Sequence, residues 1–124
     1  PSSLTDSYSL IKALYGNPGF VRHSTNIEVV VNRTVSPEDG QIVYDKLSSV
    51  ISKFLQGEVH FFGTIPQDVL LEKSVRAQKI VSLSAPNARS ARAFELLAQG
   101  LIDGEPVIEE ERLGIRELFF SFFK

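Results

Sequence analysis

The segment from residue 27 to residue 32 constrains the fold most, because it reads Ile-Glu-Val-Val-Val-Asn and is dominated by β-branched residues. β-Branched side chains favour extended backbone, so we predict a short buried strand here. Successive side chains of a strand point to opposite faces, and this strand therefore carries apolar residues on both. Such a pattern is typical of a parallel sheet that lies between layers of helices.

Two helix starts can be predicted from local signals. Ser3 with Asp6 has the form of a capping box, with Ser3 as the N-cap. Ser36 is a second N-cap, and it is followed by Pro37 at the first helical position. The acidic residues after Pro37 face the positive end of that helix.

The predicted elements alternate between helix and strand along the chain. In order they are a helix over 3–16, a strand over 27–32, a helix over 36–57, a strand over 58–64, a helix over 65–78, a strand over 80–83 and a helix over 87–102. This alternation predicts an α/β fold with a mostly parallel sheet flanked by helices. Three strands leave long unpaired edges. The chain also contains no methionine and begins at Pro1, so we expect it to be part of a larger α/β domain.

Composition excludes several classes of function. The chain has 124 residues, a net charge of −2 and no cysteine, which excludes disulfide frameworks, thiolate metal sites and cysteine nucleophiles. With only His23 and His60, a catalytic zinc site is improbable, and we interpret both as ordinary structural or solvated residues. The near-neutral charge argues against direct binding of nucleic acid. No apolar run is long enough to predict a transmembrane helix.

Motifs that carry catalysis are absent from the sequence. It has neither the Gly-x-x-x-x-Gly-Lys-Ser/Thr loop nor the Gly-x-Gly-x-x-Gly loop that cradles phosphates, and no Gly-x-Ser-x-Gly elbow. We therefore predict no catalytic residue and no metal ligand in this chain.

Two strand ends carry the candidate binding residues. Ligands of open parallel sheets sit beyond the carboxyl ends of the strands. Asn32 and Arg33 follow the first predicted strand, and Pro66, Gln67 and Asp68 follow the second. The Asn32 amide offers a donor and an acceptor to a purine edge, and the loop after Pro66 offers backbone groups. The alternatives are that Asn32 only forms a turn and that Asp68 is only an acid in the first turn of a helix.

The last sixteen residues form a predicted amphipathic tail, 109–124, separate from the unit 1–108. At helical spacing its apolar side chains gather on one side, and the candidate membrane-binding residues are Ile115, Leu118, Phe119, Phe120, Phe122 and Phe123. From Arg112 onward the charge is +2, three basic residues minus one acidic. Such a helix suits a membrane interface, but it equally suits a terminal helix docked on the core.

Five segments together resemble the C-terminal half of a MinD/ParA-family ATPase, and the resemblance is closest to the FleN/FlhG (YlxH) branch that regulates flagellar number and placement. The segments are residues 1–12, 30–33, 63–68, 74–78 and 86–94.

The resemblance implies a partial three-layer P-loop-NTPase-like fold. It also implies that the full-length protein binds ATP with magnesium, dimerises when ATP is bound and reaches the cytoplasmic face of the inner membrane through the tail. In that family, the residues that match Asn32 and the loop from Pro66 to Asp68 surround adenine, and Arg33 would flank the same pocket. Flagellar assembly proteins are the partners it implies.

Some features depart from the family pattern. The phosphate-binding lysine loop and the magnesium-binding aspartates belong to the half that this chain lacks, so no tight binding of ATP and no hydrolysis are expected from the chain alone. Ile80 stands where proline is common, and the acidic run 109–111 would repel anionic lipid. Two other hypotheses remain at this stage: a MinD-type ATPase of cell-division placement, or a nucleotide-free module that binds a protein partner.

Overall fold

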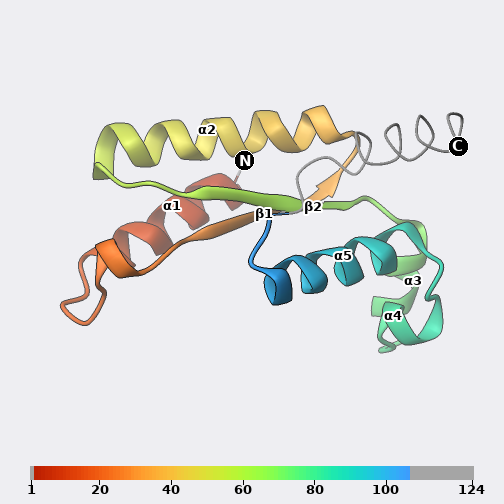
Figure 1. Cartoon of the computed structure of the whole chain (residues 1–124). Coiled ribbons are helices and arrows are strands. Elements are labelled where there is room, and N and C mark those ends of the chain that lie inside the picture. Colours follow the sequence, from red (N-terminus) through yellow and green to blue (C-terminus); the bar gives the residue numbers. More distant parts are fainter. Residues whose placement is uncertain (1, 107–124) are drawn as a thin grey trace, which may run out of the picture.

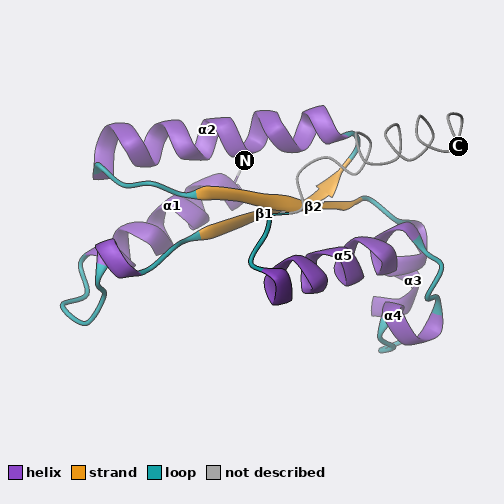
Figure 2. Cartoon of the chain, viewed as in Figure 1, coloured by secondary structure: helices purple, strands orange, loops and turns teal. Residues whose placement is uncertain are grey.

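A computed structural model describes residues 2–106 of the chain (Figures 1 and 2). Its elements, in order, are α1 (Ser2–Tyr15), η1 (Arg22–Ser24), β1 (Glu28–Thr34), α2 (Pro37–Leu55), β2 (His60–Pro66), α3 (Val69–Arg76), α4 (Val81–Ser84) and α5 (Arg89–Asp103). The predicted α/β class is confirmed, because β1 and β2 pair in parallel and helices flank them.

The two strands pair along their whole length, from Glu28 opposite His60 to Thr34 opposite Pro66. The register shifts between Val29 and Val30 and again between Asn32 and Thr34. Because the pairing is parallel, both carboxyl ends emerge at the same edge of the sheet. This edge is where the predicted binding residues lie.

Helices α2 and α5 cover opposite faces of β2, and the sheet passes between them in Figure 1. Phe61 stacks on Tyr44 of α2, with ring centroids 4.9 Å apart. The next residue, Phe62, is buried in a cluster with Leu97 of α5. Consecutive strand residues point to opposite faces, so these two contacts place one helix on each side.

The larger apolar core joins α1, α2 and the residue directly before β2. It consists of buried Ile11, Leu47, Ile51 and Val59. Tyr44 adds a polar contact to this core, because its hydroxyl donates to the backbone oxygen of Val59 at 2.8 Å. The contact fixes α2 against the start of β2.

The N-terminus of α2 is built as the sequence predicts. Ser36 is the N-cap, its Oγ accepts from the Asp39 backbone N–H at 3.2 Å, and Pro37 occupies the first helical position. Gly40 lies in the first turn, where an added Cβ would overlap the side-chain methyl of Thr64. The absence of a side chain at Gly40 therefore lets α2 approach the sheet closely.

The prediction of a third strand over 80–83 is wrong, because residues 81–83 belong to α4 and Ile80 is its N-cap. The Ser84 backbone N–H donates to the Ile80 carbonyl at 2.9 Å, which is a helical bond. Val81 is buried with Ala88 and Ala91, whereas Ile80 and Leu83 are 65% and 79% exposed. Burial of Val81 in this apolar cluster therefore outweighs the strand propensity of the short run. Within residues 2–106 the sheet has two strands.

Other predictions need smaller corrections. Ser3 is not the N-cap, since α1 already includes Ser2. The first strand is less buried than its apolar pattern predicts, because Val31 and Thr34 are buried but Val30 is 39% exposed. The observed bounds of the later strand and helices also differ from the predicted ones by one to four residues at most ends.

The predicted amphipathic tail lies outside the described residues, as do its six candidate membrane-binding side chains. None of the helices within residues 2–106 is long and apolar enough to cross a membrane.

Candidate functional site

The five residues predicted at the two strand ends line one cavity of about 390 Å³. This volume falls within the range of small-molecule sites, about 300–1,000 Å³. The cavity is lined by Asn32, Arg33, Pro66, Gln67, Asp68, Leu71, Glu72, Val75 and Arg76. The parallel pairing explains the convergence, since it brings the end of β1 and the loop after β2 to the same edge of the sheet.

Asn32 and Arg33 form an irregular end of β1. Arg33 has a φ of 58°, in the left-handed region that non-glycine residues rarely adopt. The Asn32 side-chain oxygen, Oδ1, accepts from the Arg33 backbone N–H at 2.9 Å. This bond fixes the amide orientation, because an N–H donor must meet the oxygen. The turn-forming role of Asn32 is therefore present, and its NH₂ group is the part left to serve a ligand.

Arg33 also connects the strand end to α3. Its guanidinium lies 3.6 Å from the Glu72 carboxylate, and the two side chains are 69% and 38% exposed. An ion pair this exposed contributes little stability, about 0–1 kcal/mol. A ligand can therefore displace it at low cost, and the planar guanidinium can stack on an aromatic ring.

Helix α3 supplies the wall that the sequence prediction missed. Leu71, Glu72, Val75 and Arg76 all line the cavity. The signal was available in the spacing, because Leu71 with Val75 and Glu72 with Arg76 are pairs four residues apart on one helix face. The missing information was the direction in which α3 leaves the sheet.

Pro66, the last residue of β2, and Gln67 form a short connection toward α3, which we call the loop 66–67. A backbone hydrogen bond holds this loop against β1. The Gln67 backbone N–H donates to the Thr34 carbonyl at 2.9 Å. Pro66 has no N–H to donate, so this short loop presents mainly carbonyl oxygens to its surroundings. The cavity therefore gains acceptors from the loop and donors from Asn32 and Arg33.

Asp68 caps two helices at once. Its Oδ1 accepts from the Leu70 N–H at 2.9 Å, at the start of α3. Its Oδ2 accepts from both the N–H and the Oγ of Ser90 in α5, at 2.9 and 2.8 Å. The hydrogen bonds from Ser90, that from Leu70 and the charge of Arg89 lower the pKa of Asp68 below its ordinary value. Asp68 is thus the N-cap of α3, directly before the first turn in which the alternative interpretation placed it, and both carboxylate oxygens are engaged within the protein.

Chemically, the cavity suits a flat heteroaromatic ring with a hydrogen-bonding edge. Leu71 and Val75 provide apolar surface, while the ends of β1 and β2 provide donors and acceptors. Within residues 2–106, no three acidic or histidine side chains come close enough together to hold a metal ion.

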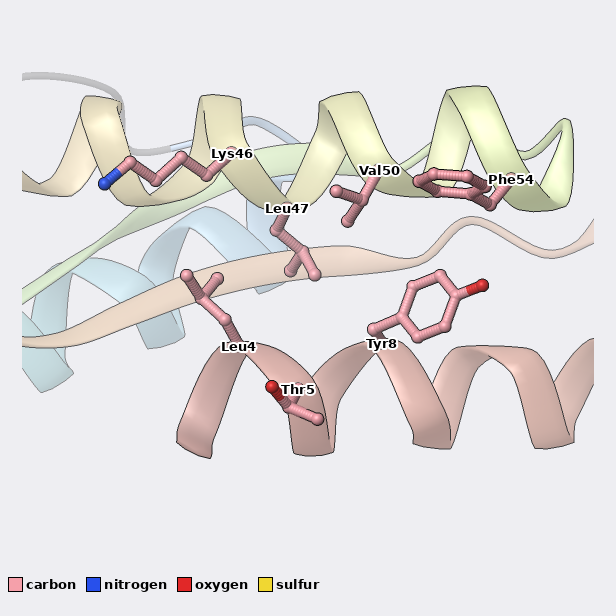
Figure 3. A pocket seen from close by; sticks show the side chains of 7 residues that line it. All are labelled: Leu4, Thr5, Tyr8, Lys46, Leu47, Val50 and Phe54. Carbon is pink, nitrogen blue, oxygen red and sulfur yellow. The ribbon is translucent and has the colours of Figure 1, made fainter. Parts of the chain in front are cut away.

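Two further cavities contain none of the predicted site residues. One, of about 410 Å³, lies between α1 and α2 and is mainly apolar, with Leu4, Tyr8, Leu47, Val50 and Phe54 in its lining (Figure 3). The other, of about 650 Å³, is polar and lies where β2 begins. His23 and His60 line this second cavity, and both are exposed, in agreement with their interpretation as solvated residues.

Comparison with known proteins shows two related proteins. The chain is 34% identical over 99 residues to the antiactivator FleN of Pseudomonas aeruginosa, an alignment that covers 80% of this chain and 34% of FleN. It is 30% identical over 126 residues to the flagellum site-determining protein YlxH of Helicobacter pylori, covering 100% of this chain and 40% of YlxH. No family model matches the sequence.

The chain therefore spans between a third and two fifths of the length of these curated relatives. The two alignments cover 80% and 100% of this chain, so the relationship extends over most of its length. This chain is a FleN/FlhG-like relative of the MinD/ParA proteins.

Proposed function

We propose that this chain is the C-terminal part of a MinD/ParA-type regulator of flagellar number or placement, and that the cavity at the strand ends binds the adenine of ATP. One observation carries the proposal: residues from two separate strand ends and from α3 line a single cavity of suitable size. The name of one relative, the flagellum site-determining protein YlxH, supports the flagellar role over a role in cell-division placement.

In this proposal the base lies against Leu71 and Val75. The Asn32 NH₂ donates to a ring nitrogen of adenine, and a carbonyl of the loop 66–67 accepts from its exocyclic amine. Arg33 moves from Glu72 onto the ring face. Such an arrangement favours adenine over guanine, because guanine carries a carbonyl oxygen where adenine has its amine.

The remaining parts of the nucleotide site lie elsewhere in the proposed full-length protein. Magnesium and the phosphates would be held by residues outside this chain, which has no phosphate-binding loop. ATP would then join two copies into a dimer. The tail would attach that dimer to anionic lipid at the cytoplasmic face of the inner membrane, where flagellar assembly proteins are the proposed partners. Pairing of two weak tails raises their avidity for the membrane.

The test is the binding of a fluorescent ATP analogue with magnesium, followed by anisotropy in the full-length protein. We expect saturable binding that ATP competes away and that GTP competes away much less well. The isolated 124-residue chain should show no magnesium-dependent hydrolysis of ATP. Equal competition by ATP and GTP, or turnover by the isolated chain, would contradict the proposal.

A further inference from the structure

The loop between β2 and α3 is attached to the protein at two points. At its start, the Gln67 N–H bonds to the end of β1, at 2.9 Å from the Thr34 oxygen. At its end, Asp68 bonds to Ser90 in α5, twenty-two residues further along the chain. Both Gln67 and Asp68 line the cavity, so the two attachment points belong to its wall.

The start of α5 depends on Asp68 for its cap. The residue at its N-cap position, Ala88, has no side-chain acceptor and makes no capping bond. The backbone N–H of Ser90, the second helical residue, therefore receives no acceptor from an N-cap side chain. Asp68 supplies that acceptor from another element, at 2.9 Å, and binds the Ser90 hydroxyl as well. Ser90 is fully buried and Asp68 is half-buried, so the access of water to these bonds is restricted on the Ser90 side.

The geometry therefore leaves the Asp68 carboxylate little freedom to serve a ligand. One oxygen is held by Leu70 and the other by both polar groups of Ser90. A carboxylate in this arrangement is fixed in place, and it fixes the backbone that precedes it. If the Asp68 carboxylate turned toward a purine edge, it would lose hydrogen bonds that cap two helices.

We propose that Asp68 is a positioning residue, which acts through Ser90 to hold the loop 66–67 at the distance that a nucleobase requires, and that it does not contact the base. This inference rests on the proposed adenine site and assigns Ser90, a residue outside the cavity lining, a role in base recognition. If the inference holds, loss of the contact between Asp68 and Ser90 weakens the part of ATP affinity that the base contributes. It does not weaken the part that the phosphates contribute.

The test variant is Ser90→Ala, which removes the hydroxyl bond to Asp68 and keeps the backbone bond. Its matched control is Ser74→Ala. Ser74 is also buried, at 7% exposure, and its hydroxyl bonds to that of Ser84 at 3.0 Å. Both substitutions remove one hydrogen bond of a buried serine, but the control contacts neither Asp68 nor the loop.

The Kd values of the full-length protein are measured for magnesium ATP and for magnesium tripolyphosphate, which has the phosphates without a base. Loss of one buried hydrogen bond corresponds to about a three- to tenfold change. We expect Ser90→Ala to raise the Kd for ATP by that factor and to leave the Kd for tripolyphosphate unchanged. Ser74→Ala should change neither, because a general loss of stability does not discriminate between the two ligands.

A second variant covers the case in which Ser90→Ala does not fold. Asp68→Asn keeps the size of the side chain and the acceptor for Leu70, but it places an NH₂ donor opposite Ser90. We expect the same selective loss of ATP affinity, and we expect that adding Ser90→Ala to it has little further effect, since both act through one contact.

The outcomes are distinct. If wild type binds ATP and both Ser90→Ala and Asp68→Asn bind it equally well, the positioning role is refuted while the adenine site stands. If both ligands weaken by the same factor, the bridge has only a structural role and the inference is wrong. If wild type binds neither ligand, the proposed function itself fails, and the inference fails with it.

Discussion

The substitution Asn32→Asp separates the two roles of the Asn32 side chain. Its oxygen holds the Arg33 N–H at 2.9 Å, and its NH₂ group is proposed to donate to adenine. Aspartate retains an oxygen for the first role, so the left-handed turn at Arg33 should persist. It replaces the donor by a second oxygen, so that the carboxylate faces a ring nitrogen that also accepts.

The expected loss follows from hydrogen-bond energetics. A buried group left without its partner costs about 1–3 kcal/mol. Since about 1.4 kcal/mol corresponds to a tenfold change, the Kd for ATP should rise by roughly 5- to 150-fold. Asn32 lies at an exposed strand end, so the free energy of unfolding should change by less than about 0.5 kcal/mol.

Anisotropy of a fluorescent ATP analogue with magnesium measures the affinity in the full-length protein, and urea titration measures stability. Asn17→Asp is the matched control, because the Asn17 Oδ1 likewise accepts a local backbone bond, from Gly19 at 2.8 Å. Asn17 does not line the cavity, and its substitution should leave ATP affinity unchanged. An Asn32→Asp protein that binds ATP as tightly as wild type would show that Asn32 is only a turn residue.

Three further predictions concern packing, charge and the tail. Gly40→Ala should lower the free energy of unfolding by about 1–3 kcal/mol in urea titration, because the new methyl overlaps Thr64; equal or greater stability would contradict the close approach of α2. The lowered pKa of Asp68 implies that its ionised form stabilises the fold. That contribution is fully present above about pH 4 and is lost as pH falls through the folded-state pKa; Asp68→Asn should therefore show a weaker decline in stability in acid than wild type, and an identical decline would refute this. In the tail, Phe119→Asp combined with Phe122→Asp should abolish ATP-dependent co-sedimentation with phosphatidylglycerol-containing liposomes, because each buried phenylalanine contributes about 1.5–3 kcal/mol. Continued sedimentation of that variant would make the tail a structural helix.

Local signals predicted those elements whose ends are fixed by neighbouring residues. Helix α2 is the clearest example, since Ser36 and Pro37 act within its own first turn. The short run at Ile80 was mispredicted for the opposite reason. Its β-branched residues favour a strand, but Val81 is buried in a cluster with Ala88 and Ala91, and this packing depends on how the chain folds after α4.

The residues of the candidate site also divide into those that a simple rule predicts and those that depend on how the helices pack. Asn32 and Pro66 were predictable because the carboxyl ends of parallel strands meet, a rule that requires only the order of the elements. Leu71 and Val75 were not predicted, because their place depends on the direction of α3. The bond from Asp68 to Ser90 links residues twenty-two positions apart, and it becomes visible only once α5 is placed.

The most direct test of the adenine site is photo-crosslinking with 8-azido-ATP, whose reactive group sits on the base, followed by peptide mapping. We expect the label to fall on residues 32–33 or on 66–76, and we expect excess ATP to prevent labelling. Label confined to another part of the protein, such as the apolar cavity between α1 and α2, would contradict the proposed adenine site.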